Sequence, residues 1–274
     1  MLDFSNSKIL IVGDVMLDKY YFGKVDRISP EAPVPIVNIQ KEESRLGGAS
    51  NVANNIVSLG GHSLLCGVIG HDLFGKEIER ISRHKNIDTF LLKTSSPTIT
   101  KARIIGGKQQ IVRVDYEDKS ELNADNKKLF RDTISRILPE YDILVISDYG
   151  KGLISEDLCR YLIKLAHKYD KKVIIDPKGK NWEKYSGADI VTPNVKELSD
   201  IVGYTVPNTD RAIEKAAREA ITNNHLTALL VTRSDKGMSL IGPIPPIHIP
   251  THSEEVFDVS GAGDTVVATL GLCL

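Results

Sequence analysis

The chain of 274 residues is long enough for one large α/β domain or two small ones, because domains usually hold about 100–200 residues. Its hydrophobic content of 41%, charged content of 26% and net charge of −1 argue against nucleic acid or a membrane surface as the main partner. Three scattered cysteines form no CxxC pair, no apolar run approaches a membrane span, and no secretory signal is evident. We therefore expect a cytoplasmic protein.

Short apolar runs rich in valine and isoleucine alternate with helical patterns, which predicts βαβ units around a mainly parallel sheet. The clearest predicted strands are residues 8–12, 143–146, 173–175, 190–191 and 228–231. Polar residues follow each of them closely, and these include Asp14, Asp148, Asp176, Asn194 and Thr232. One such residue could be a helix cap, but five predict a ligand site at the carboxyl edge of the sheet.

Two stretches break this alternation. Residues 18–39 carry three consecutive aromatic residues and then three prolines, which confine strands to sheet edges or bulges. Residues 98–115 resemble two strands joined by the two-residue connection Gly106-Gly107. We expect both stretches to form a small separate β-sheet that serves either as a lid over the ligand edge or as a dimer surface.

A glycine-rich segment, Gly47-Gly48 followed by Asn51, leads into a predicted helix. Glycine lets a ligand approach the backbone closely, and an asparagine amide both donates and accepts hydrogen bonds. Together with Asp14 at the end of the first strand, these residues predict a site for sugar hydroxyls. A tight helix-entry turn without a ligand would explain the same glycines.

The predicted hairpin is basic, with Lys101, Arg103, Lys108 and Arg113. Four cations beside a sugar pocket could bind a substrate phosphate, although solvated strand faces are often basic as well.

The segment Asp258-Val259-Ser260-Gly261-Ala262-Gly263-Asp264-Thr265 is the most informative one in the chain. Apolar residues at helical spacing follow it, so the glycines should lie at a helix N-terminus, where free N–H groups and the helix dipole favour an anion. Asp264 stands where a carboxylate could take a proton from an attacking hydroxyl. An anion cradle beside a candidate base is what phosphoryl transfer needs. A capped helix with an acidic first turn is the simpler alternative.

Two other nucleotide-binding patterns are incomplete. Residues 70–77 match GxxxxGK, but Glu77 stands where a P-loop needs serine or threonine for magnesium. No glycine cluster completes GxGxxG, so a nicotinamide enzyme has little support.

Taken together, these motifs resemble the ribokinase family of small-molecule kinases. Gly13-Asp14, Gly47-Gly48 with Asn51, and GAGD ending at Asp264 match its pattern. Within that family, the segments RISPEAPVP (27–35), KARII…QQIVRVD (101–115), SDYGKG (147–152) and DPKG (176–179) are similar to those of heptose 7-phosphate kinases. Such kinases often form the N-terminal module of a bifunctional protein with an adenylyltransferase domain.

The resemblance implies a three-layer ribokinase-like α/β fold with helices on both faces of the sheet and a small β lid. It implies ATP and Mg²⁺ as cofactors, with a possible monovalent cation. The catalytic residues would be Asp264 as base and Gly261, Ala262 and Gly263 as anion cradle. The nucleotide residues would be Asn194, Glu197 (indirectly on the metal), Thr232, Ser234 and Gly237. The substrate residues would be Asp14, Gly47, Gly48, Asn51, Arg103, Gln110, Arg113, Lys151 and Lys178.

The resemblance further implies phosphorylation of D-glycero-β-D-manno-heptose 7-phosphate at its anomeric hydroxyl, and a homodimer formed through the lid. One departure is that residue 274 falls inside the helix begun near Asp264, whereas family members continue further. We therefore expect residues 1–274 to be a C-terminally incomplete kinase domain. A ribokinase-like kinase of another phosphosugar or a nucleoside, and a non-catalytic nucleotide- or sugar-binding scaffold, stay open as alternatives.

Overall fold

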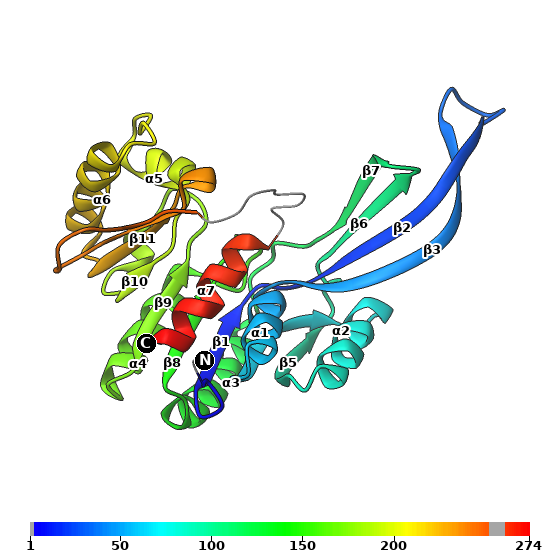
Figure 1. Cartoon of the computed structure of the whole chain (residues 1–274). Coiled ribbons are helices and arrows are strands. Elements are labelled where there is room, and N and C mark those ends of the chain that lie inside the picture. The colour runs from blue at the N-terminus through cyan, green and yellow to red at the C-terminus, as the bar shows by residue number, and fades with distance from the viewer. Residues whose placement is uncertain (1–2, 252–260) are drawn as a thin grey trace.

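The computed structural model describes residues 3–251 and 261–274, and these residues form a nine-stranded sheet and a separate four-stranded sheet (Figure 1). The strand order of the larger sheet is β13-β12-β11-β10-β9-β8-β1-β4-β5. Its strands are β1 (Lys8–Gly13), β4 (His62–Gly70), β5 (Asp88–Thr94), β8 (Ile143–Ser147), β9 (Lys172–Asp176), β10 (Ile190–Val191), β11 (Ala228–Thr232), β12 (Met238–Ile241) and β13 (Ile247–Ile249). Pairing is parallel from β5 to β11 and antiparallel through β12 and β13, so the predicted mainly parallel sheet is confirmed.

Helices cover both faces of this sheet, which confirms the three-layer fold. They are α1 (Ala49–Ser58), α2 (Leu73–His84), α3 (Ala124–Ile137), α4 (Glu156–Lys168), α5 (Val195–Val202), α6 (Asp210–Asn224) and α7 (Ala262–Cys273). Side chains alternate between the two faces of a strand, so Ile9 and Ile11 of β1 pack with α1, α2 and α7, whereas Leu10 and Val12 pack with α3 to α6. None of the helices in the described part of the chain has the length and apolar character needed to cross a membrane.

Polar side chains fix where several of these helices begin. Asp72, Asn123 and Ser155 each accept a hydrogen bond from a backbone N–H in the first turn of α2, α3 and α4. Asp72 therefore caps a helix in the segment that matches GxxxxGK, where Glu77 had argued against a P-loop.

The four-stranded sheet projects away from the main body and consists of two long strands and a shorter hairpin (Figure 1). It consists of β2 (Val15–Ile28), β3 (Pro35–Gly48), β6 (Thr100–Gly106) and β7 (Gln109–Tyr116) in the order β3-β2-β6-β7. Because β2 follows β1 after a single residue, the lid grows directly out of the ligand edge of the larger sheet. The predicted small separate sheet is confirmed.

Two details of the predicted lid are wrong. The paired arms run from Val15 to Gly48, well beyond residues 18–39, because antiparallel pairing continues down to the main sheet. The hairpin connection is Gly107-Lys108, since Gly106 still pairs with Gln109 and Gly107 takes the positive φ of 63°. Pro35 opens the edge strand β3, in agreement with the rule that proline avoids central strands.

Candidate active site

Asp264 lies in the first turn of α7. The helix begins directly after Gly261, whose left-handed backbone (φ 79°) turns the chain into it. Asp264 is 4% exposed, and side chains from two distant segments bind its carboxylate. Oδ2 accepts a 2.7 Å hydrogen bond from Asn51 Nδ2, and Oδ1 accepts one of 2.7 Å from the Tyr149 hydroxyl. The predicted helix N-terminus is thereby confirmed, while residues 258–260 of the motif lie outside the described residues.

Burial raises the pKa of Asp264, and the hydrogen bonds from Asn51 and Tyr149 oppose that rise. Burial and the neighbouring Asp264 carboxylate raise the pKa of Tyr149, which keeps its phenol protonated as a donor. The carboxylate is therefore held in place by two neutral donors. Such an arrangement suits a base, because the lone pairs of the carboxylate that are not hydrogen-bonded are then held in a fixed direction.

Two hollows meet at this carboxylate. The lid-side hollow is lined by Asp18, Gly47, Gly48, Asn51, Lys101 and Arg103, among others, and has a volume of about 660 Å³. The sheet-edge hollow is lined by Asp148, Asp176, Lys178, Asn194, Glu197, Thr232 and Gly263, among others. Tyr149, Gly261 and Asp264 line both. A reacting group in one hollow can thus meet a group in the other beside Asp264.

The lid-side hollow has the polar lining expected for a hydroxylated ligand. Gly48 has a φ of 55°, and a Cβ there would lie 2.6 Å from the Asp14 carbonyl oxygen, so only glycine fits this turn. Arg103 forms a 2.5 Å ion pair with Asp18. Lys101 Nζ lies 5.7 Å from the centre of the Tyr149 ring, and burial lowers the pKa of this lysine.

The other predicted hairpin residues do not line this hollow. Gln110 and Arg113 lie on β7, the outer strand of the lid, where every residue is exposed. Arg113 forms 2.8 and 2.9 Å hydrogen bonds with Asp115 on its own strand. Lys101 and Arg103 on the inner strand β6 are therefore the predicted hairpin cations that the fold brings to the hollow.

The sheet-edge hollow combines anion-binding and cation-binding groups. Gly263 and the N-terminus of α7 face it, and a Cβ at Gly263 would meet nothing within 4 Å, so a ligand has room at this end of the helix. Burial and the Asp264 and Glu197 carboxylates raise the pKa of Asp176. Within the described residues no cluster of three histidine, cysteine or acidic side chains could hold a metal. The oxygen-bearing side chains of this hollow fit a Mg²⁺–nucleotide, in which the ligand's own phosphates supply much of the coordination.

Asn194 and Glu197 form a capping box at the start of α5. The Asn194 side chain accepts from Glu197 N (2.9 Å), and the Glu197 carboxylate accepts from Asn194 N (3.0 Å). The other Glu197 oxygen lies 3.4 Å from Lys178 Nζ. Lys178, predicted from the sequence on the substrate side, thus lies in the hollow that also holds Thr232.

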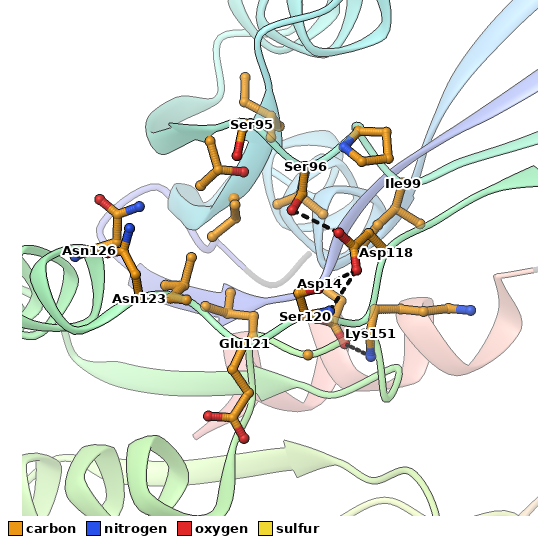
Figure 2. Close-up of a pocket in the computed structure, with 18 of the residues that line it drawn as sticks. Asp14, Ser95, Ser96, Ile99, Asp118, Ser120, Glu121, Asn123, Asn126 and Lys151 are labelled. Atoms are coloured by element: carbon orange, nitrogen blue, oxygen red, sulfur yellow. Dashed lines mark hydrogen bonds between the residues drawn. The ribbon is translucent and has the colours of Figure 1, made fainter.

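Besides Gln110 and Arg113, five predicted residues line neither hollow. Ala262 begins α7 between two residues that do. Ser234 and Gly237 belong to the turn after β11, where a Cβ on Gly237 would come within 2.0 Å of the Ile249 carbonyl oxygen, so packing alone requires glycine. Asp14 and Lys151 line a third hollow of about 360 Å³ (Figure 2).

Sequence reasoning missed two side chains at the centre of the site, namely Asp18 and Tyr149. Tyr149 is the more consequential, because it touches Asp264 and lines both hollows. The available signal was its position in SDYGKG, one residue after the aspartate that follows β8. A tyrosine hydroxyl has no motif that reveals a partner 115 residues away.

Replacing Tyr149 with Phe should lower kcat about tenfold and move the acid limb of the pH–rate profile to higher pH. Loss of the hydroxyl removes a hydrogen bond that lowers the pKa of Asp264, so the carboxylate should protonate at higher pH. The measurement is kcat from pH 5 to 9. Tyr185→Phe is the matched control, because that hydroxyl bonds Asp148 at 2.7 Å and not Asp264. An unshifted acid limb in Tyr149→Phe would contradict this role.

A buried carboxylate at the junction of two polar hollows, beside a helix N-terminus, is the arrangement of an enzyme that transfers phosphoryl groups to small molecules. The model of the pfkB family carbohydrate kinases matches residues 6–274, and the chain belongs to this family of sugar kinases. The predicted resemblance to ribokinase-type kinases is thereby confirmed.

Curated relatives agree with this assignment. The chain is 45% identical to the bifunctional protein HldE of Haemophilus influenzae (strain PittEE) over 274 residues, 99% of this chain and 56% of the relative. It is 45% identical to HldE of Vibrio vulnificus (strain YJ016) over 98% of this chain and 56% of the relative. The chain thus spans about half the length of these curated relatives.

Two solved structures share the fold at low sequence identity. The tetrameric inhibited form of phosphofructokinase-2 from Escherichia coli superposes with a TM-score of 0.80 at 21% identity, over 97% of this chain and 86% of that one. Arabidopsis thaliana ribokinase complexed with ribose and ATP gives a TM-score of 0.74 at 20% identity, over 98% and 86%. The ribokinase-like fold predicted from the sequence is confirmed.

Proposed function

We propose that this chain transfers the γ-phosphate of ATP to the anomeric hydroxyl of D-glycero-β-D-manno-heptose 7-phosphate. The product would be the 1,7-bisphosphate, an intermediate of ADP-heptose synthesis for the lipopolysaccharide core. The observation that carries the proposal is the position of Asp264, which is held by Asn51 and Tyr149 where the two hollows meet. The heptose itself is favoured by the resemblance of several segments to heptose 7-phosphate kinases.

In this mechanism Asp264 removes the proton of the anomeric hydroxyl, and backbone N–H groups of residues 261–263 stabilise the negative charge of the transferring group. A general base contributes about 10²–10⁴ in rate, and one preorganised donor about 10²–10³. The base and these donors belong to adjacent residues of one turn. This turn therefore supplies a large part of the rate acceleration. The protein otherwise has to align the reactants and exclude water.

ATP and Mg²⁺ are proposed for the sheet-edge hollow, with a monovalent cation as a possible addition. When bound, Mg²⁺ would neutralise charge on the phosphates. Lys178 and the α7 N-terminus would bind phosphate oxygens, while Asn194, Glu197 and Thr232 would border the nucleotide. Glu197 would act on the metal indirectly, because its carboxylate already accepts the Asn194 N–H.

The sugar phosphate is proposed for the lid-side hollow. Asn51 and the backbone of Gly47 and Gly48 would hold hydroxyls there, and Arg103 with Lys101 would bind the 7-phosphate.

Replacing Arg103 with Ala should raise KM for the phosphosugar about 10–100-fold and leave KM for ATP nearly unchanged, because a hydrogen bond to a charged group is worth about 1.5–3 kcal/mol. Arg113→Ala is the matched control, since Arg113 faces its partner Arg103 in the hairpin yet does not line the hollow. Steady-state kinetics with both substrates provide the measurement. Equal effects of Arg103→Ala on both KM values would mean that this arginine, with Asp18, serves lid folding alone.

Three features of the whole protein are part of the proposal. The native protein would carry a fused adenylyltransferase domain, would act in the cytoplasm, and would dimerise through the lid. The dimer is supported by exposed apolar side chains on the lid strands: Val25, Ile28, Ile39, Ile111, Val112 and Val114.

A coupled ADP-release assay over a panel of acceptors tests the substrate. Heptose 7-phosphate should give the highest kcat/KM, ahead of fructose 6-phosphate, ribose and adenosine. A higher value for another phosphosugar or for a nucleoside would establish the alternative kinase. ATP binding without ADP release on any acceptor would establish a non-catalytic scaffold.

A further inference from the structure

The segment that matches GxxxxGK, residues 70–77, contacts the root of the lid hairpin formed by β6 and β7. Asp72, at the start of α2, binds Thr98 just before β6 begins. The ring of Phe74 lies 5.5 Å from the ring of Tyr116, the last residue of β7. A segment whose glycines resemble a phosphate loop therefore holds both strands of the hairpin where they leave the main body.

Thr98 is fully buried and is bound to the main body through its backbone and its side chain. Its N–H donates to Asp72 Oδ2 (2.7 Å), and its hydroxyl donates to Asp72 Oδ1 (2.7 Å). The same hydroxyl accepts from the Gly70 N–H (2.8 Å). Burial raises the pKa of Asp72, but the hydrogen bonds from Thr98 and Gly75 together lower that pKa below its ordinary value, so the carboxylate is charged at neutral pH. Hydrogen bonds to a charged acceptor are about twice as strong as neutral ones, so Thr98 is held firmly.

Helix capping alone does not explain this arrangement. To cap α2, Asp72 needs only the bond that it accepts from Gly75 N (2.8 Å). Asn123 and Ser155 cap α3 and α4 with bonds of that kind. The two bonds from Thr98 instead join Asp72 to the strand that follows, so this carboxylate has a second role.

The two glycines of the segment are required by the close approach around Thr98. A Cβ at Gly70 would lie 2.6 Å from Asp72 Oδ2 and 2.8 Å from Thr98 N. A Cβ at Gly75 would lie 2.6 Å from the Gly70 carbonyl oxygen and 2.9 Å from Thr98 Oγ1. The pattern that resembles a P-loop is thus explained without a phosphate ligand.

The Asp72–Thr98 contact fixes the start of the strand that carries two cations of the lid-side hollow. Lys101 and Arg103 follow Thr98 on β6, and both line that hollow. The Thr98 carbonyl oxygen also accepts a 3.1 Å hydrogen bond from the buried Thr100 hydroxyl. Because β6 is paired on both sides, with β2 and β7, a shift at its start moves both cations together.

We infer that Asp72 and Thr98 are positioning residues for the phosphosugar, because through β6 they hold Lys101 and Arg103 over the lid-side hollow before the ligand binds. Neither Asp72 nor Thr98 lines that hollow or the sheet-edge hollow, so both act through the strand. Cations that are already in place bind a phosphate without the cost of ordering them. The inference rests on the proposed function, which places the substrate phosphate beside these two cations.

Thr98→Val keeps the shape of the side chain but loses the hydroxyl that bonds Asp72 and Gly70. It should raise KM for the phosphosugar about tenfold and leave KM for ATP nearly unchanged, because the two cations move and the nucleotide side does not. Thr98→Ser keeps the hydroxyl and should restore KM to within about twofold of the parent. Steady-state kinetics with both substrates provide the measurement.

Asp72→Asn separates the anchoring of the lid from the capping of α2. The asparagine oxygen can still accept from Gly75 N, but the NH₂ group then faces the Thr98 N–H, so two donors meet. This variant should raise KM for the phosphosugar at least as much as Thr98→Val.

Ser155→Ala is the matched control for lost stability, since it removes the cap of α4 in the main body. It should lower the melting temperature and leave both KM values unchanged. In a chain that carries Lys101→Ala and Arg103→Ala, Thr98→Val should raise KM for the phosphosugar no further, because the groups that it misplaces are gone. A purely structural role would raise KM in both backgrounds.

Three results would overturn the inference: equal rises in both KM values, a rise in Ser155→Ala as large as in Thr98→Val, or an effect of Thr98→Val that persists without the two cations. If losing both cations raised KM for the phosphosugar but Thr98→Val did not, the inference would fail while the proposed function stood. If losing both cations left that KM unchanged, the proposed place of the substrate phosphate would be wrong, and the inference would fail with it.

Discussion

Asp264→Asn should lower kcat by about 10²–10⁴ while the affinities for ATP and sugar phosphate change little. Asparagine has nearly the same shape but cannot take a proton from the acceptor hydroxyl at neutral pH. The two donors that hold Asp264 can adapt, because the Asn51 amide can turn its oxygen toward the new NH₂ group and the Tyr149 hydroxyl can still donate. The substitution therefore removes the base while leaving the frame intact.

Single-turnover phosphoryl transfer on a variant shown by melting to be folded is the measurement. Burial raises the pKa of Asp264, so its ionised form costs stability above that pKa, and the neutral asparagine variant should melt no lower than the parent at neutral pH. In the parent enzyme, kcat should fall as the pH drops through the raised pKa. A transfer rate within a few-fold of the parent would remove Asp264 from the mechanism.

Gly261→Ala should lower kcat by about 10²–10³, which is the effect of misplacing one preorganised backbone donor. A Cβ at this position would lie 2.7 Å from Asn51 Nδ2, and the residue has a left-handed φ of 79°. The methyl group must therefore displace either the turn or the asparagine that holds Asp264. Both displacements damage the same cradle.

The backbone strain can be separated from the damage to the site with Gly203→Ala. Gly203 also has a φ of 79°, at the C-terminus of α5, and a Cβ there would meet nothing within 4 Å. Both variants should lose about 1–2 kcal/mol of stability from the left-handed alanine, but only Gly261→Ala should lose activity. Parallel urea unfolding and kcat measurements decide this. Equal activity losses would show that strain, rather than the cradle, limits the rate.

The main architecture could be predicted because the strands from 8–12 to 228–231 are short, apolar and followed by polar residues. That pattern depends on local sequence alone, and tertiary contacts do not change which of these segments become strands. The extent of the lid could not be predicted, because antiparallel pairing between Val15 and Gly48 is decided across the sheet. The connection at Gly107-Lys108 was misplaced by one residue for the same reason, since either glycine allows a turn.

The candidate site was predictable where one motif contains both the turn and the reactive group, as with Gly261 and Asp264. It was not predictable where distant segments meet. Asn51 and Asp264 are 213 residues apart, and Tyr149 reaches the same carboxylate from the loop after β8. Asp14 was predicted beside Asn51, yet its carboxylate is buried, accepts hydrogen bonds from the backbone N–H groups of Tyr149 and Lys151, and lines neither hollow beside Asp264.

Phosphorus NMR of the products tests the central claim most directly. With ATP, Mg²⁺ and D-glycero-β-D-manno-heptose 7-phosphate, the account predicts one new phosphate resonance coupled to the anomeric proton, formed in equal amount with ADP and absent with Asp264→Asn. A new phosphate on any other carbon, or ADP formed together with free inorganic phosphate and no new sugar phosphate, would contradict it.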